Sequence, residues 1–289
     1  MFAGYHVKAK YYASIADRLA SWGYAVIQYD RSDVAVPPSE VESAYVAPIL
    51  SWAAKANATA RHPLVGQLDT STLVMLGHSM GGSLASIAAA GFANRTQTMV
   101  LLDPVDYTQL SLRVARKFLQ DYGKPVAILP VGVHCADRTG CMPFLDHSPN
   151  AQDNQLAQTL GCKPDWWCCD WDDHTPGLEV KTSIQDPTDG ADGYIEFAVP
   201  GSMVATLRDA GHMSFLDYNP TTDPAFVINC PWKAVPSQVL LDVLPLVVGW
   251  VEHKVRGVDI TPLADWAAAP GEQQRLQFTL KKACLSSNS

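Results

Sequence analysis

The sequence has few charged residues, and among those it has, basic ones are scarce. Charged residues make up 17% of the chain, and 21 Lys and Arg stand against 29 Asp and Glu, for a net charge of −8. Nucleic acids and anionic membrane surfaces are bound through basic patches, so neither is expected as the main partner. The hydrophobic content of 47% over 289 residues excludes intrinsic disorder and is sufficient for a large core.

Long apolar runs and paired cysteine motifs are also missing. The longest apolar run, near residues 243–251, is interrupted by Pro245 and is shorter than the roughly 20 residues of a transmembrane helix. Residues 1–6 lack the basic stretch and apolar run of a secretory signal peptide. The seven cysteines form no C-x-x-C pair, which excludes the thioredoxin and zinc-ribbon classes.

What the sequence does contain is an alternation of strand-like and helix-like segments. Short apolar runs predict strands at residues 24–29, 72–76, 98–102, 125–130 and 203–207. Helical spacing of apolar residues, or a high alanine content, predicts helices at residues 11–21, 41–57, 83–92 and 237–254. This alternation predicts an α/β fold, with a mostly parallel sheet flanked by helices, in a single domain over residues 1–289.

An insertion at about residues 132–193 breaks this alternation. It is rich in Asp, Pro, Cys and Trp, and it is too long for an ordinary connecting loop, so it is either functional or separately folded. Its tryptophans Trp166, Trp167 and Trp171 would form either a small core or an aromatic lid over a flat apolar substrate. The aspartates of residues 186–193 do not follow EF-hand spacing, so we expect no metal site. The tail after Gly257 is weakly patterned.

The strongest chemical motif is Gly-His-Ser-Met-Gly-Gly at residues 77–82, a G-x-S-x-G pattern between a predicted strand and a predicted helix. In that context Ser79 is expected at the tip of a sharp turn that lifts its hydroxyl out of the sheet. Side chains at the flanking positions would collide there, which accounts for Gly77 and Gly81. His78 is expected to pack beneath this turn. The motif predicts a serine nucleophile.

A serine nucleophile needs a base and an acid. His212 follows the last predicted core strand, where the base of a Ser-acid-His order belongs. Asp103 closes the strand after the nucleophile's helix, whereas Asp137 lies in a loop beyond the next strand and Asp106 in a turn. The general rule for such folds favours Asp137, but a rigid strand aims Asp103, so we expect Asp103 to be the acid.

An oxyanion formed by attack of Ser79 also needs two main-chain donors. The amide of Met80, at the start of the following helix, is expected to be one. The other is expected from Tyr5, because Phe2 and Ala3 have the pattern of a strand end before a glycine. Strands normally precede that strand in this kind of fold, so we expect that amino-terminal strands are missing from this chain and that the sheet lacks its antiparallel edge.

Three blocks of the sequence resemble chlorophyllases, which are α/β-hydrolases that cleave the phytyl ester of chlorophyll. They are residues 77–82, residues 102–106 (Leu-Asp-Pro-Val-Asp) and residues 211–217 (Gly-His-Met-Ser-Phe-Leu-Asp). Residues 4–5 and 19–24 are similar both to chlorophyllases and to polyester-hydrolase and cutinase-like enzymes. Land-plant chlorophyllases usually have Arg after the nucleophile, whereas this chain has Met80, which is also common in the polyester hydrolases.

The resemblance implies an α/β-hydrolase fold with Ser79 as nucleophile, Asp103 as acid and His212 as base. It implies a serine carboxylesterase that converts chlorophyll to chlorophyllide and phytol, in the chloroplast and without a cofactor, since magnesium would belong to the substrate. The alternatives are a general lipase or polyester hydrolase and a non-catalytic module that binds an apolar ligand. Retention of Ser79, His212 and a nearby acid disfavours the non-catalytic module. The sequence indicates no oligomeric state.

Overall fold

A computed structural model describes a central sheet and the helices around it. The described residues are 1–4, 7–30, 39–105, 114–131, 194–195, 197–217 and 236–282. The predicted insertion and residue Tyr5 lie outside these ranges.

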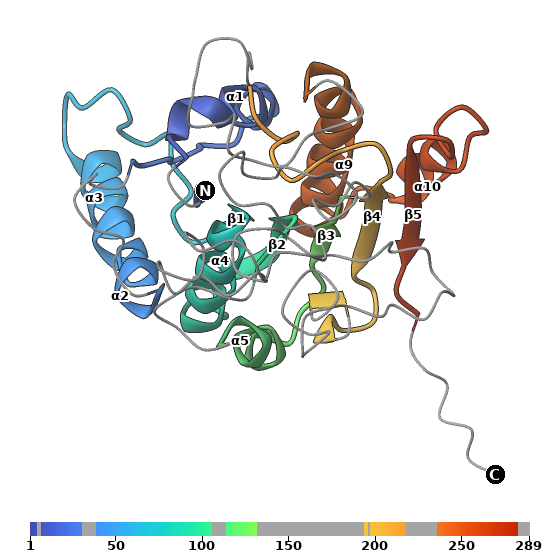
Figure 1. The fold of residues 1–289 in the computed structure, drawn as a ribbon. Helices are drawn as coiled ribbons and strands as arrows, with labels where there is room; N and C mark the ends of the chain where they lie inside the picture. Colours follow the sequence, from blue (N-terminus) through green and yellow to red (C-terminus); the bar gives the residue numbers. More distant parts are fainter. Residues whose placement is uncertain are drawn as a thin grey trace, which may run out of the picture.

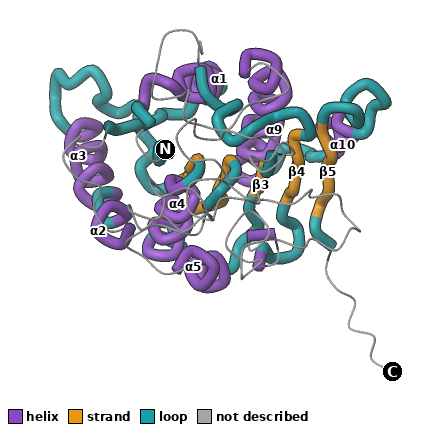
Figure 2. Tube along the Cα trace, viewed as in Figure 1, coloured by secondary structure: helices purple, strands orange, loops and turns teal. Residues whose placement is uncertain are grey.

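A five-stranded sheet forms the centre of the described fold (Figures 1 and 2). Its strands are β1 (Leu73–His78), β2 (Thr96–Leu102), β3 (Ala127–Leu129), β4 (Met203–Leu207) and β5 (Leu276–Leu280), and they lie side by side in that order. Strands β1 to β4 are parallel, and β5 pairs with β4 in the antiparallel sense. Phe2 adds a parallel bridge to Gly77 on the free side of β1. The mostly parallel sheet expected from the sequence is therefore present.

Helices cover both faces of this sheet (Figure 1). On one face lie α1 (Ala13–Ser21), which follows the 3-10 helix η1 (Ala9–Tyr12), and α9 (Pro236–Arg256). The other face is covered by α4 (Met80–Gly91) and α5 (Val114–Tyr122), with α2 (Ser39–Ser43) beside α4 and α3 (Val46–Ala58) after it. Helix α10 (Thr261–Ala267) contacts α9 and β5. The described fold thus has three layers, helix, sheet and helix.

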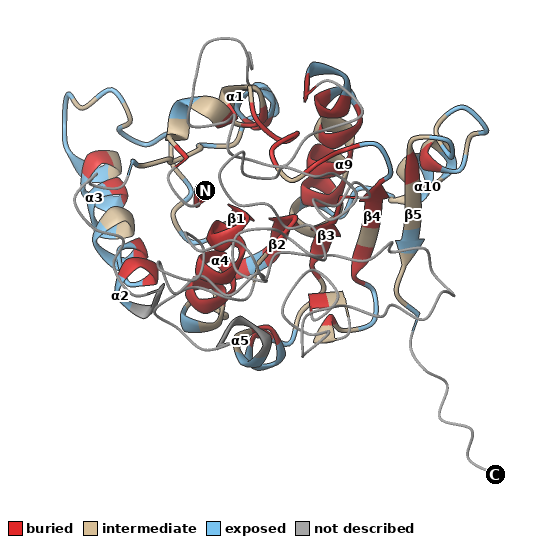
Figure 3. Ribbon diagram, viewed as in Figure 1, coloured by how far each residue is buried: buried red, intermediate tan, exposed pale blue. Residues whose placement is uncertain are grey.

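The side chains of β2 show how the strands build two cores. Val100 and Leu102 pack with α1 and α9, whereas Met99 and Leu101, which point to the opposite face, pack with α4 and α5. All four are fully buried, as the colouring of Figure 3 shows for the central strands. A strand buried on both faces needs apolar residues at consecutive positions, which is the pattern that predicted it.

Three features differ from the sequence-based expectations. Residues 24–29, predicted to be a strand, have no strand structure; the Met1 nitrogen donates to the Ile27 oxygen (2.8 Å), and the Tyr24 amide donates to the Leu19 oxygen (3.2 Å). The helix predicted at 41–57 is interrupted by a turn at Ala44 and Tyr45, which separates α2 from α3. The weakly patterned tail contains α10 and β5, which the sequence did not predict, and β5 gives the described sheet an antiparallel edge where the sequence led us to expect none.

Helix α9 is the longest described helix, and it is amphipathic rather than apolar throughout. Pro245 lies inside it, and Asp242 and Glu252 are buried on it with ion-pair partners, Arg275 and Arg256. Within the described ranges, no helix combines the length and the apolar character that crossing a membrane requires.

Candidate active site

Ser79 stands at a sharp turn between β1 and α4. Its backbone has φ 57° and ψ −129°, a region that residues with a side chain rarely occupy. Main-chain bonds fix the turn: the Ser79 amide donates to the Leu102 oxygen (3.0 Å), and the Ser79 oxygen accepts from the amides of Gly82 (2.8 Å) and Val105 (3.2 Å). The strand-turn-helix geometry expected for a G-x-S-x-G motif is therefore present, and neighbouring segments hold its strained backbone.

The glycines around Ser79 are required by close approach of the backbone. A Cβ on Gly77 would lie 1.9 Å from the Gly81 oxygen, and a Cβ on Gly81 would lie 2.4 Å from the Phe2 oxygen. Real Cβ atoms do not approach backbone so closely, so any side chain at either position would force the turn open. The collision that the sequence led us to expect for side chains at positions 77 and 81 is therefore present in the structure.

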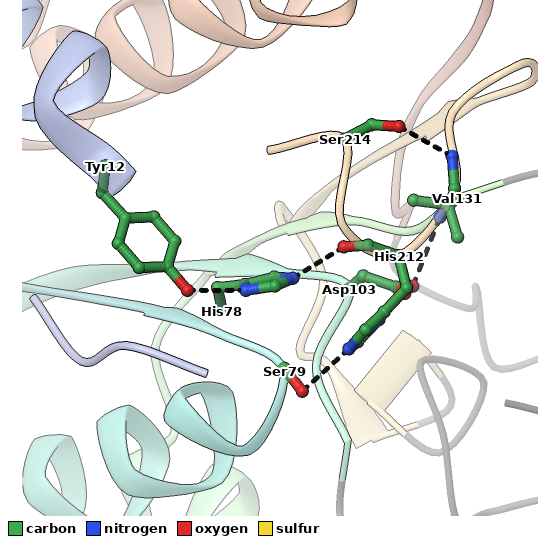
Figure 4. Close-up of polar contacts among 8 residues, drawn as sticks. Tyr12, His78, Ser79, Asp103, Val131, His212 and Ser214 are labelled. Carbon is green, nitrogen blue, oxygen red and sulfur yellow. Dashed lines mark hydrogen bonds and ion pairs between the residues drawn. The ribbon is translucent and has the colours of Figure 1, made fainter. Parts of the chain in front are cut away.

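Ser79, His212 and Asp103 form a continuous hydrogen-bonded row (Figure 4). Ser79 Oγ lies 2.8 Å from His212 Nε2, and His212 Nδ1 lies 2.6 Å from Asp103 Oδ2. The three residues follow the carboxyl ends of β1, β2 and β4, which meet at one edge of the sheet. In this arrangement the imidazole can take the serine proton while the carboxylate holds the ring and stabilises its charged form.

Among the described residues, Asp103 is the carboxylate that contacts His212. It is 1% exposed, and its second oxygen, Oδ1, accepts from the Val131 amide (3.3 Å), so both oxygens have partners. Its φ of 40° is unusual for a residue with a side chain. The predicted contact between Asp103 and His212 is therefore present, and the role of Asp103 as the acid stays a prediction; Asp106 and Asp137 lie outside the described residues.

The loop that carries His212 is fixed to the start of α1. The Ser14 amide donates to Asp217 Oδ2 (2.5 Å), and the Asp217 amide donates to the Tyr11 oxygen (2.7 Å). Within the loop, Ser214 Oγ accepts from the Gly211 amide (2.9 Å). These bonds give structural roles to Ser214 and Asp217, which the sequence offered only as part of a family-like block.

The predicted oxyanion and substrate residues are only partly described. Met80 is the first residue of α4, and the main-chain amides in the first turn of a helix have no acceptor within that helix. Gly4 lies against the serine turn, because a Cβ on it would be 3.3 Å from Ser79 Cβ. Tyr5, Trp166, Trp167 and Trp171 lie outside the described residues. Among the described residues, no group of three or more His, Cys, Asp or Glu could hold a metal ion.

His78 is buried beneath Ser79 and uses both ring nitrogens. Nδ1 lies 2.7 Å from the Tyr12 hydroxyl, and Nε2 lies 2.8 Å from the main-chain oxygen of His212. Its ring also packs against the Phe215 ring at a centroid distance of 5.4 Å. Complete burial, and secondarily the nearby His212, lowers the pKa of His78 from 6.5 to about 3. The ring is therefore neutral at the pH at which esterases are assayed.

This low pKa predicts an acid-sensitive fold. Between pH 6.5 and 3 the unfolded chain binds a proton on His78 that the folded protein does not bind. The free energy of unfolding therefore decreases as the pH is lowered through this range. His78 alone should remove about 2 kcal/mol between pH 7 and pH 5. Urea unfolding at both values should show that His78→Gln loses less stability over this interval than wild type. Equal losses in the two proteins would contradict the assignment.

Comparison with known proteins supports the hydrolase interpretation of this geometry. The family model described as PET hydrolase-like matches residues 1–120, which include Ser79 and Asp103. The chain has the α/β-hydrolase fold. The match supports a relationship with polyester hydrolases, and with carboxylic ester hydrolases in general, rather than with chlorophyllases specifically. A search of curated proteins found no match.

Sequence reasoning missed one participant in this α/β-hydrolase site. Tyr12 contacts His78 across 66 positions of sequence, and no motif surrounds it. Tyr12 lies in the helix predicted at residues 11–21, and its side chain is 1% exposed in the structure. Only the folded geometry reveals that its hydroxyl faces the site (Figure 4).

Proposed function

We propose that this protein is a serine hydrolase of carboxylic esters, with Ser79 as nucleophile, His212 as general base and acid, and Asp103 as the group that orients His212. The observation that carries the proposal is the continuous row from Ser79 Oγ to His212 (2.8 Å) and on to Asp103 (2.6 Å). Each distance is within the reach required for proton transfer or orientation.

In the first half-reaction Ser79 Oγ attacks the ester carbonyl carbon while its proton passes to His212 Nε2. The negative charge that develops on the carbonyl oxygen is stabilised by the main-chain amides of Met80 and Tyr5. His212 then gives the proton to the departing alcohol, and the acyl group remains on Ser79. Asp103 accepts the Nδ1 hydrogen bond throughout and stabilises the imidazolium.

In the second half-reaction water takes the place of the alcohol. His212 removes a proton from the water, which attacks the acyl-Ser79 carbonyl. The carboxylic acid leaves and Ser79 recovers its proton. The proposal needs no cofactor, because ester hydrolysis moves only protons and the acyl group.

Two substrate classes are supported by different observations. The family match over residues 1–120, together with Met80 after the nucleophile, supports a polyester or related synthetic or natural ester. The three sequence blocks at residues 77–82, 102–106 and 211–217 support the phytyl ester of chlorophyll, for which a plastid location would follow. Both substrates are largely apolar and would gain from burial of their hydrocarbon surface.

One set of assays tests the function and separates the substrates. Purified protein should be incubated with p-nitrophenyl esters, with amorphous poly(ethylene terephthalate) film and with chlorophyll a, and the products identified by chromatography. Terephthalate products would support the polyester class, and chlorophyllide with phytol would support the chlorophyll class. Absence of turnover and of labelling by a fluorophosphonate would contradict the proposal and favour a non-catalytic binding module.

The insertion provides a prediction about substrate size. If Trp166, Trp167 and Trp171 line the mouth of the site, replacing them with Ala should weaken hydrolysis of long-chain p-nitrophenyl esters more than that of p-nitrophenyl acetate. The physical reason is the apolar area that each tryptophan buries on the substrate, at about 25 cal/mol per Å². The ratio of kcat/KM for palmitate and acetate esters measures the effect. An unchanged ratio would place the tryptophans away from the substrate.

A further inference from the structure

His78 is a buried titratable group that the proposed reaction does not use, although it follows Gly77 and directly precedes the nucleophile. It is fully buried, yet both of its ring nitrogens have hydrogen-bond partners. One partner is the hydroxyl of Tyr12, and the other is the main-chain oxygen of His212, 134 positions away in the sequence. Burying an imidazole is costly unless both of its ring nitrogens have hydrogen-bond partners. The two bonds therefore offset the cost of burying His78 at this position.

The direction of each hydrogen bond can be worked out from its atoms. The His212 oxygen can only accept, so Nε2 of His78 carries the hydrogen. A neutral ring with a protonated Nε2 has a bare Nδ1, which must accept the bond from the Tyr12 hydroxyl. The Tyr12 oxygen in turn accepts from the Gly4 amide at 2.9 Å. Hydrogen bonds therefore run in one direction from Gly4, through Tyr12 and His78, to His212.

The two ends of this sequence of bonds belong to the reaction machinery. Gly4 precedes Tyr5, whose amide we propose as an oxyanion donor, and its backbone lies against Ser79. At the other end, the accepting oxygen belongs to His212 itself. The middle residue, His78, is joined covalently to Ser79. The segments that carry Gly4, Ser79 and His212 must meet around one ester carbonyl. Three hydrogen bonds connect these segments.

We propose that Tyr12 and His78 are positioning residues, forming a hydrogen-bond relay that holds the oxyanion loop at Gly4 and the backbone of His212 in register around Ser79. This inference rests on the proposed esterase function. The relay does not move a proton in the reaction, and neither side chain touches the substrate. It acts through geometry, since small displacements of a base or an oxyanion donor lower the rate of the chemical step more than substrate binding.

Three single variants, their control and one double variant test the relay. Tyr12→Phe keeps the ring and removes the hydroxyl that links Gly4 to His78. His78→Leu removes both bonds of the imidazole, whereas His78→Gln keeps a side-chain N–H that can donate to the His212 oxygen. Tyr122→Phe is the matched control, because Tyr122 is also a buried tyrosine, and its hydroxyl bonds the Thr96 oxygen (3.3 Å) at the opposite end of β2.

The readouts are kcat and KM for p-nitrophenyl butyrate, with the melting temperature and the rate of fluorophosphonate labelling measured in parallel. Tyr12→Phe is expected to lower kcat by about 10- to 100-fold with KM changed by less than about two-fold. His78→Gln should retain more activity than His78→Leu. The Tyr12→Phe and His78→Leu double variant should be little slower than the slower single variant, because both changes break the same relay. Tyr122→Phe should keep the kcat of wild type.

Failure of the relay and failure of the esterase function give different results. If wild type is labelled at Ser79 and turns over the ester, but folded Tyr12→Phe has an unchanged kcat, the relay is overturned and the esterase function stands. Multiplicative losses in the double variant, or equal activity of His78→Gln and His78→Leu, would also overturn it. If wild type shows neither labelling nor turnover, the esterase function fails and the relay fails with it.

Discussion

Replacing Ser79 with Ala is expected to lower kcat for p-nitrophenyl ester hydrolysis by on the order of 10⁴-fold or more. Without the hydroxyl no acyl-enzyme can form, and only the oxyanion donors and substrate binding remain to favour direct attack by water. The fold should survive, because the Ser79 turn is held by main-chain bonds to Leu102, Gly82 and Val105 rather than by its hydroxyl.

Ser86 provides the matched control for this variant. It lies on the same helix, α4, is fully buried, and bonds the Gly82 oxygen through its hydroxyl (2.9 Å). Ser86→Ala should therefore lose some stability but keep its reaction with a labelled fluorophosphonate, whereas Ser79→Ala should not be labelled. Labelling of Ser79→Ala at the rate of wild type would show that another residue is the nucleophile.

Replacing Asp103 with Asn is expected to lower kcat by on the order of 10⁴-fold while the shape of the site is retained. The Asn side chain can present an N–H to His212 Nδ1, which then accepts instead of donating. The ring hydrogen would consequently sit on Nε2 and point at Ser79, so the base could no longer take the serine proton. The kinetic measurement is kcat for a small p-nitrophenyl ester at pH 7 and above.

Asp137 and Asp242 are the comparisons for this second variant. Asp137→Asn tests the residue that the general rule for the fold favours, and it should keep most of the activity. Asp242→Asn breaks the ion pair between Asp242, which is buried in the first half of α9, and the partly exposed Arg275, and it should lower stability more than kcat. If Asp137→Asn proved as damaging as Asp103→Asn, the contact between Asp103 and His212 would not be the one that matters for turnover.

The sequence was informative where one local pattern determines the structure. Strands buried on both faces, such as β2, appear as unbroken apolar runs, and the serine turn has a pattern of glycines that sterics require. The position of Asp103 was also predictable, because it directly follows a clean apolar strand. In these cases the neighbouring residues along the chain supply most of the constraint.

Other features depended on contacts between distant segments. Residues 24–29 have the composition of a strand, but a strand exists only when a neighbour supplies a ladder of hydrogen bonds, and the described residues show isolated main-chain bonds there instead. Strand β5 has the opposite property. Its mixed sequence is weakly patterned, yet it pairs along five residues with the edge of β4 that does not face β3. Tyr12 likewise acquires its role from His78 and Gly4, which no periodicity connects to it.

The attachment of the His212 loop to α1 has a consequence for the biosynthesis of the enzyme. His212 follows Asp103 by 109 positions, and the loop reaches its place by bonding Ser14 and Tyr11, near the start of the chain. A nascent polypeptide that ends before this loop would carry nucleophile and acid without a base. By the proposed mechanism, ester turnover by nascent chains on stalled ribosomes would not appear until residue 217 has left the exit tunnel. Its onset would therefore report when the His212 loop joins residues 11–14.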